Sequence, residues 1–199
     1  AENKALTALY APLEEWRTKG RAESDIDALL PTALRLKSLL AGDSKAQAPI
    51  LEMAWMHLAN FASEAIQVTQ PPASDRVREL KILLLDMVDH PDPVPEPDEN
   101  AKWTDPHWTH EPRNQAAEAL PALMCLAPGS DVLDAIRKLS ADPVPSVRFL
   151  LAKELWRFGK KDLPTMLLIL DGMVSSGPNV GVLSGVTVSL SKFIASDRE

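Results

Sequence analysis

The amino-acid sequence predicts an all-α fold, a stack of antiparallel helical hairpins, on the basis of three observations. Apolar residues recur at helical spacing along nearly all of the 199 residues. A composition with only 8 glycines and 1 tyrosine disfavours a β-rich fold. Many of the 17 prolines stand beside Ser, Asp or Gly at the edges of apolar segments, where proline starts or separates helices.

The N-terminal part of the chain, residues 1–90, is predicted to form helical hairpins from its periodicity alone. A first apolar stripe continues to about Leu40, and Gly42-Asp43-Ser44 ends that helix and caps the next. Pro71-Pro72 ends the following helix, and a further helix begins at Ser74-Asp75. Because short turns separate these helices, neighbouring helices should be antiparallel.

Residues 91–111 are predicted to form an acidic, proline-rich loop without an apolar period. The segment from Asp86 to Glu111 holds eight acidic residues and one lysine, in a chain whose net charge is −7. A loop of this length is usually functional or disordered. It contains Trp103 and Trp108, and large aromatic residues are enriched as interface anchors. Either these tryptophans fold back onto the helices or they contact a partner.

Residues 112–199 are predicted to continue the helical stack. Helical periodicity returns at about Pro112, and the breaks at residues 128–130, 141–143 and 176–178 divide the segment into helices. Several of these helices are apolar over more than half of their circumference, as a stacked repeat demands, because each hairpin packs on the one before and the one after. The whole chain should therefore form one continuous stack of about eight or nine helices.

An internal repeat of 35 residues is the most specific signal in the sequence. Residues 112–120 align without gaps to residues 147–155, which places Arg113 opposite Arg148. Val77-Arg78 lies 35 residues before Arg113 and opens another helix. The proline-rich loop stands where an intervening helix of that earlier copy should be.

These residues resemble the HEAT-repeat family, whose motif is an Asp-Pro turn, then Val-Arg, then an Ala-rich helix that ends in Leu. Residues 142–148 read Asp-Pro-Val-Pro-Ser-Val-Arg and are followed by Ala152 and Leu155, in agreement with the motif. The resemblance implies a right-handed superhelix of hairpins, a HEAT or armadillo-like α-solenoid. In the copy at residues 105–120, Asp105-Pro106 lies two residues further from the arginine than the pattern allows.

The resemblance also implies structural roles in the repeat turns for Asp142, Arg148 and Arg113. They would form a ladder of polar contacts between neighbouring repeats. A carboxylate at a helix start can cap amide donors while it faces a guanidinium. A looser resemblance over residues 142–193, to C-terminal helical-repeat regions of large bacterial multidomain proteins, implies as an alternative the sensor or recognition region of an anti-phage defence NTPase.

Sequence motifs for catalysis and for metal binding are missing. There is no Gly-x-Ser-x-Gly, no His-Glu-x-x-His and no pair of cysteines. The single cysteine, Cys125, lies in an apolar run and is expected to be a buried, inert thiol in a reducing compartment, the cytoplasm. His107 and His110 lack a second pair of ligands at a suitable spacing. We therefore expect no enzyme activity, no catalytic residue, no cofactor and no metal site.

The charge pattern favours a protein partner over nucleic acid. An acidic chain is poorly suited to neutralise phosphates, although Lys153 and Arg157, together with Lys160 and Lys161, form a basic stripe that could receive a phosphate backbone. The apolar stretch of residues 163–174 is too short to span a bilayer. The sequence thus predicts a scaffold or interaction module for a protein partner or for neighbouring domains of the same polypeptide. Its candidate contact residues are Trp103, Trp108, Arg148, Lys153 and Arg157, and nucleic-acid binding is the other alternative.

Overall fold

The computed structural model describes residues 2–42, 45–71, 74–104, 110–175 and 179–196. Every regular element within these ranges is helical, which confirms the predicted all-α fold. The ranges hold nine helices of ten residues or more, two helices of four residues and one 3-10 turn, slightly more than the eight or nine helices expected. The elements are α1 (Glu2–Thr18), η1 (Glu23–Asp25), α2 (Ile26–Leu40), α3 (Ala48–Val68), α4 (Ser74–Met87), α5 (Glu99–Lys102), α6 (Pro112–Leu126), α7 (Ser130–Ser140), α8 (Pro145–Glu154), α9 (Trp156–Gly159), α10 (Leu163–Ser175) and α11 (Val180–Ser196).

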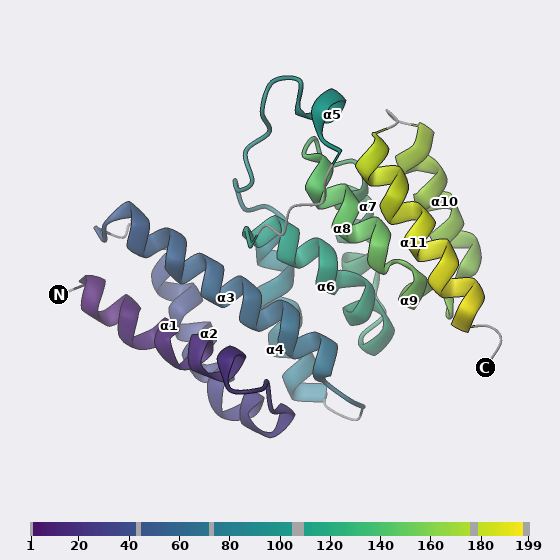
Figure 1. Cartoon of the computed structure of the whole chain (residues 1–199). Helices are drawn as coiled ribbons and strands as arrows, with labels where there is room; N and C mark the ends of the chain where they lie inside the picture. Colours follow the sequence, from purple (N-terminus) through teal and green to yellow (C-terminus); the bar gives the residue numbers. More distant parts are fainter. Residues whose placement is uncertain (1, 43–44, 72–73, 105–109, 176–178, 197–199) are drawn as a thin grey trace.

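The helices pack in two rows along the chain (Figure 1). In the first row, α1, α3, α6, α8 and α11 lie side by side, each in contact with the next. In the second row, α2 packs on α4 and α7 packs on α10, while α4 also contacts α6. The N-terminal helix α1 and the hairpin of α10 and α11 therefore lie at opposite ends of the molecule (Figure 1).

Helix α3 shows why the first-row helices are apolar on more than one side. It packs against α1, α2, α4 and α6, so most of its circumference must be buried. Leu58, Phe61 and Ile66 are buried along it, and its alanines let the neighbouring backbones approach closely. The Phe61 ring meets Trp16 of α1 edge to face, at 5.2 Å between ring centroids.

Helices α8 and α11 approach each other closely at Gly185. A side chain at Gly185 would place its Cβ only 2.8 Å from the main-chain oxygen of Phe149 and 3.3 Å from the Cβ of Ala152. Gly181 and Ser189 are buried on the same side of α11. Gly185 allows α11 to pack closely on α8, whereas a Cβ at Gly181 would meet the ring of Trp103.

Two buried histidines should make the protein less stable as the pH falls. Burial lowers the pKa of His57 and of His90, while the nearby carboxylates of Glu14 and Asp92 oppose that shift. Both side chains are therefore neutral in the folded protein, whereas the same histidines in the unfolded chain take up protons near pH 6.5. The contribution of these neutral rings to the free energy of unfolding is fully present above about pH 6.5. It is lost as the pH drops below that value.

Urea unfolding of the wild type and of the variant His57→Gln/His90→Gln at pH 7.5 and pH 5.5 measures this dependence. We expect the wild type to lose stability over this interval, by up to about 1.4 kcal/mol for each unit by which a pKa is lowered. The double variant should lose less. An equal loss in both proteins would contradict the assignment to these two residues.

Candidate protein-interaction surfaces

The loop that follows α4 folds back over the start of three first-row helices. We term residues 90–104 the strap; it contains α5 and lies against the N-terminal ends of α6, α8 and α11 (Figure 1). Of the predicted loop of residues 91–111, positions 105–109 lie outside the described residues. The described part is held by hydrogen bonds from α6, from α8 and from the residue before α11.

Arg113, the second residue of α6, holds the beginning of the strap. One terminal nitrogen donates to the carbonyl oxygens of His90 and Pro91 at 2.9 and 3.0 Å. The other donates to the carbonyl oxygen of Pro93 at 2.6 Å. Its Nε lies 3.0 Å from the Asp142 carboxylate, which is itself buried. A planar guanidinium with five N–H groups is suited to such a set of acceptors.

Asp142 links two successive helices of the first row. Its carboxylate pairs with Arg113 of α6 and accepts a hydrogen bond from the backbone N–H of Val144, just before α8, at 2.9 Å. The Asp142 carboxylate thus holds the turn that leads into α8 while it faces the guanidinium of α6. Of the three residues given a structural role in the sequence, Asp142 and Arg113 are brought into contact. Arg148 instead contacts the strap.

Arg148 and Asn179 hold the second half of the strap. A terminal nitrogen of Arg148 donates to the side-chain oxygen of Asn100. The amide nitrogen of Asn179 donates to the carbonyl oxygens of Asn100 and Trp103 at 2.6 and 2.8 Å, and its oxygen caps α11 through the N–H of Val182. The sequence predicts no role for Asn100. For Asn179 the sequence offers one signal, since an Asn immediately before a helix is a common cap.

Trp103 is folded back onto the helices. Its ring lies 5.7 Å from that of Phe149, measured between centroids. A Cβ on Gly181 would lie 2.1 Å from the Trp103 ring, so glycine is required at this point of α11. Trp103 therefore anchors the strap within the chain. Trp108, the other predicted anchor, lies outside the described residues.

Lys153 and Arg157 of the predicted basic stripe pair with two carboxylates. Lys153 lies 3.2 Å from Glu118 of α6, and Arg157 lies 2.8 Å from the buried Glu154. Lys192 of α11 joins the group, at 3.4 Å from Glu154. Arg157, Lys160 and Lys192 also stand over the ring of Trp156, between 5.0 and 5.6 Å from its centroid. The group therefore ties α6, α8, α9 and α11 together.

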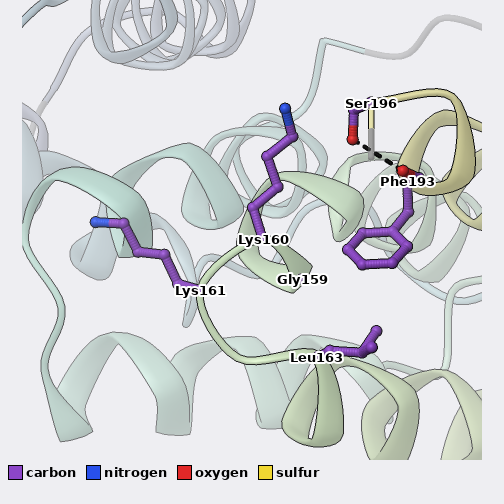
Figure 2. Close-up of a pocket in the computed structure, with 6 residues that line it drawn as sticks. All are labelled: Gly159, Lys160, Lys161, Leu163, Phe193 and Ser196. Carbon is purple, nitrogen blue, oxygen red and sulfur yellow. Dashed lines mark hydrogen bonds between the residues drawn. The ribbon is translucent and has the colours of Figure 1, made fainter. Parts of the chain in front are cut away.

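A cavity of about 430 Å³ lies between α9, the start of α10 and the end of α11 (Figure 2). In Figure 2 the ammonium groups of Lys160 and Lys161 point away from Phe193 and Leu163. Lys161 donates to the carbonyl oxygen of Cys125. Binding pockets usually direct a few polar groups at one point, and this cavity lacks that arrangement. Its lining residues are Gly159, Lys160, Lys161, Leu163, Phe193 and Ser196.

The outer side of the last hairpin is apolar and uncovered. We term this surface the end face; α10 and α11 contribute to it side by side (Figure 1). Leu168 and Val180 are each 67% exposed, which is unusual for large apolar side chains on adjacent helices. At the other end, the described part of α1 exposes no large apolar side chain, and α2 exposes Leu39, at 42%. The end face consists of Leu163, Leu167, Leu168 and Val174 of α10 with Val180, Val188 and Ile194 of α11.

The remaining candidate groups show little reactive chemistry. Cys125 is half-buried, and burial raises the pKa of its thiol, whose Sγ lies 3.3 Å from the carbonyl oxygen of Arg157. His110 lies 3.1 Å from the side-chain oxygen of Asn60. Within the ranges that the structure describes, no three His, Cys, Asp or Glu side chains gather as metal ligands. In the same ranges no helix combines the length and apolarity needed to cross a membrane.

Comparison of the chain with protein-family models, with curated proteins and with solved structures gives no match. Function is therefore inferred from the surfaces of the molecule. Two of them stand out, the end face and the strap with the donors that hold it.

Proposed function

We propose that this chain is a non-catalytic helical-repeat scaffold that docks a helical neighbour onto its end face. The neighbour is a helical pair, either in another domain of the same polypeptide or in a separate protein. The observation that carries the proposal is the row of exposed apolar side chains on α10 and α11. A group of exposed large apolar side chains on two adjacent helices is typical of interaction sites, because leaving such side chains in water is unfavourable.

The two-row packing supports a HEAT-like repeat, and we propose that the rows form a right-handed superhelix. Arg113 and Arg148, 35 residues apart, both stand in the first turn of a first-row helix. The ion pair between Asp142 and Arg113 joins successive first-row helices, as the family resemblance implies. Each repeat of such an array buries its apolar side against the next repeat. An uncovered apolar side, such as the end face, is therefore suited to pack against a further pair of helices.

The contrast between the two ends of the molecule supports docking at one end only. Arrays of this kind need polar outer faces on their terminal repeats. Helix α1 presents Glu2, Lys4, Thr7 and Glu14 to solvent and so provides such a face. The hairpin of α10 and α11 does not provide a polar outer face, because it exposes large apolar side chains. The looser resemblance to defence-type multidomain proteins fits the same proposal, since a sensor region must also dock onto its neighbouring module.

Nucleic-acid binding is not part of the proposal. Lys153, Arg157 and Lys192 each lie within 3.4 Å of Glu118 or Glu154. Phosphate contacts would have to replace these internal pairs, in a chain whose net charge of −7 repels a polyanion.

Site-specific photo-crosslinking tests the docking proposal and identifies the neighbour. A photoreactive amino acid is placed at Leu168 on the end face or, as the matched control, at Ala11 on the exposed side of α1. We expect irradiation of cells that express each protein to link position 168 to a helical segment, identified by mass spectrometry. Position 11 should give no such product. Equal labelling from both positions, or none from position 168, would exclude the end face as a docking site.

A further inference from the structure

Three hydrogen-bond donors stand in a line along one edge of the first row. Arg113 and Arg148 lie in the first turns of α6 and α8, and Asn179 immediately precedes α11. Arg148 is 5% and Asn179 is 3% exposed, so their polar groups are committed to interior contacts. Because α6, α8 and α11 lie side by side, the three side chains form one line. We term Arg113, Arg148 and Asn179 the donor row.

The donor row holds the strap almost entirely by its main chain. Within the described residues, the hydrogen bond from the row to a strap side chain joins Arg148 to the amide oxygen of Asn100. Recognition of carbonyl oxygens depends on the path of the main chain and only weakly on its side chains. Arg113 and Asn179 together donate to the carbonyl oxygens of His90, Pro91, Pro93, Asn100 and Trp103.

A proline-rich segment is the natural complement of such a row. Proline has no backbone N–H, and an extended proline-rich segment leaves its carbonyl oxygens without internal partners. The hydrogen-bond donors of the row can therefore bind the free carbonyl oxygens of such a segment. Because two members of the row are guanidinium groups, the row also favours a segment with negative charge. The strap contains Pro91, Pro93, Pro95 and Pro97, and its acidic residues Asp92, Glu96, Asp98 and Glu99 outnumber Lys102.

The strap leaves part of the row unsatisfied. The Nε of Arg148 is buried and has no hydrogen-bond partner among the described residues. Burial also lowers the pKa of Arg148, and the charges of Asp142 and Glu99 only partly offset that effect. A buried donor without an acceptor is costly. A segment that supplied one more acceptor at this point would therefore satisfy the row better than the strap does.

We propose that the donor row is a binding site for a proline-rich, acidic segment of a partner protein that follows the path of the strap, and that the strap occupies this site in cis until the partner segment replaces it. An aromatic side chain of the partner would take the place of Trp103 against Phe149 and Gly181. The donor row and the end face share no residue, although Asn179 stands next to Val180, and each surface has its own test. Either proposal can therefore fail without the other.

The test uses a fluorescein-labelled synthetic peptide with the sequence of residues 88–104 and measures its anisotropy. In the wild type the tethered strap competes at an effective concentration on the order of millimolar. The variant Asn100→Ala/Trp103→Ala weakens the strap and keeps the donor row, so it should bind the peptide at least about tenfold more tightly than the wild type. Adding Asn179→Ala should reverse that gain, whereas adding Thr187→Ala, an exposed position of α11, should not.

Cooperative thermal unfolding followed by circular dichroism establishes that each variant is folded. If the double variant does not fold, the single variant Asn100→Ala, which retains Trp103, is used in the binding assay instead. A folded strap-weakened variant that binds the peptide no more tightly than the wild type would overturn the proposal. Binding that is equally strong with and without Asn179→Ala would overturn it too, because the peptide would then be bound elsewhere.

Discussion

Replacing Arg113 with alanine should lower the free energy of unfolding by about 3 kcal/mol, because it leaves the buried Asp142 carboxylate without its cation. The same change removes the hydrogen bonds to three strap carbonyl groups. Urea denaturation followed by circular dichroism at pH 7 measures the effect. Arg113→Lys should recover only part of the loss, because an ammonium group cannot reproduce the planar set of donors.

The matched control is Arg78, which the internal repeat places 35 residues before Arg113. Arg78 pairs with Asp75 at 3.0 Å, but both side chains are exposed, at 67% and 81%. Exposed pairs of this kind contribute little, so Arg78→Ala should cost less than about 0.5 kcal/mol. Similar losses at the two positions would show that the surroundings of Arg113 do not set its contribution.

Replacing Gly185 with valine should destabilise the chain by about 2–3 kcal/mol, because α11 would have to move away from α8. Even a Cβ at this position would lie 2.8 Å from the main-chain oxygen of Phe149, and that backbone atom cannot swing aside as a flexible side chain could. The midpoint of thermal unfolding, supported by urea denaturation, measures the effect.

Replacing Gly172 of α10, in the same hairpin, should have the opposite effect on the stability of the chain. A Cβ there would meet no atom within 4 Å. Gly172→Ala should therefore stabilise the chain by about 0.5–1 kcal/mol, since alanine is the better helix former. If both glycine replacements changed stability in the same direction, contact between α8 and α11 would not explain the effect at Gly185.

The sequence was most informative where neighbouring repeats meet. The helices follow from apolar periodicity, and the 35-residue offset marks similar positions in successive first-row helices. Lys153 and Glu118 are separated by that same offset, and they form an ion pair between α8 and α6. The offset would have shown Lys153 to be an internal partner rather than a candidate contact for a phosphate or a protein.

The path of the strap could not be read from the sequence. Main-chain carbonyl groups are present at every residue, so no residue type marks which of them will meet Arg113 or Asn179. Trp103 illustrates the same limit. An aromatic residue in a polar loop fits both a folded-back and a partner-bound state, and only the space left by Gly181 shows where its ring lies.

The hydrogen bonds of Asn179 also bear on how the molecule unfolds. Arrays in which each repeat touches only its neighbours tend to lose structure from their ends. Asn179 bonds to residues 76 and 79 positions earlier, a much longer separation than those between adjacent hairpins. Loss of the last hairpin would release the strap, and loss of the strap would loosen that hairpin. This long-range tie joins the middle of the chain and its last hairpin into a single cooperative unit.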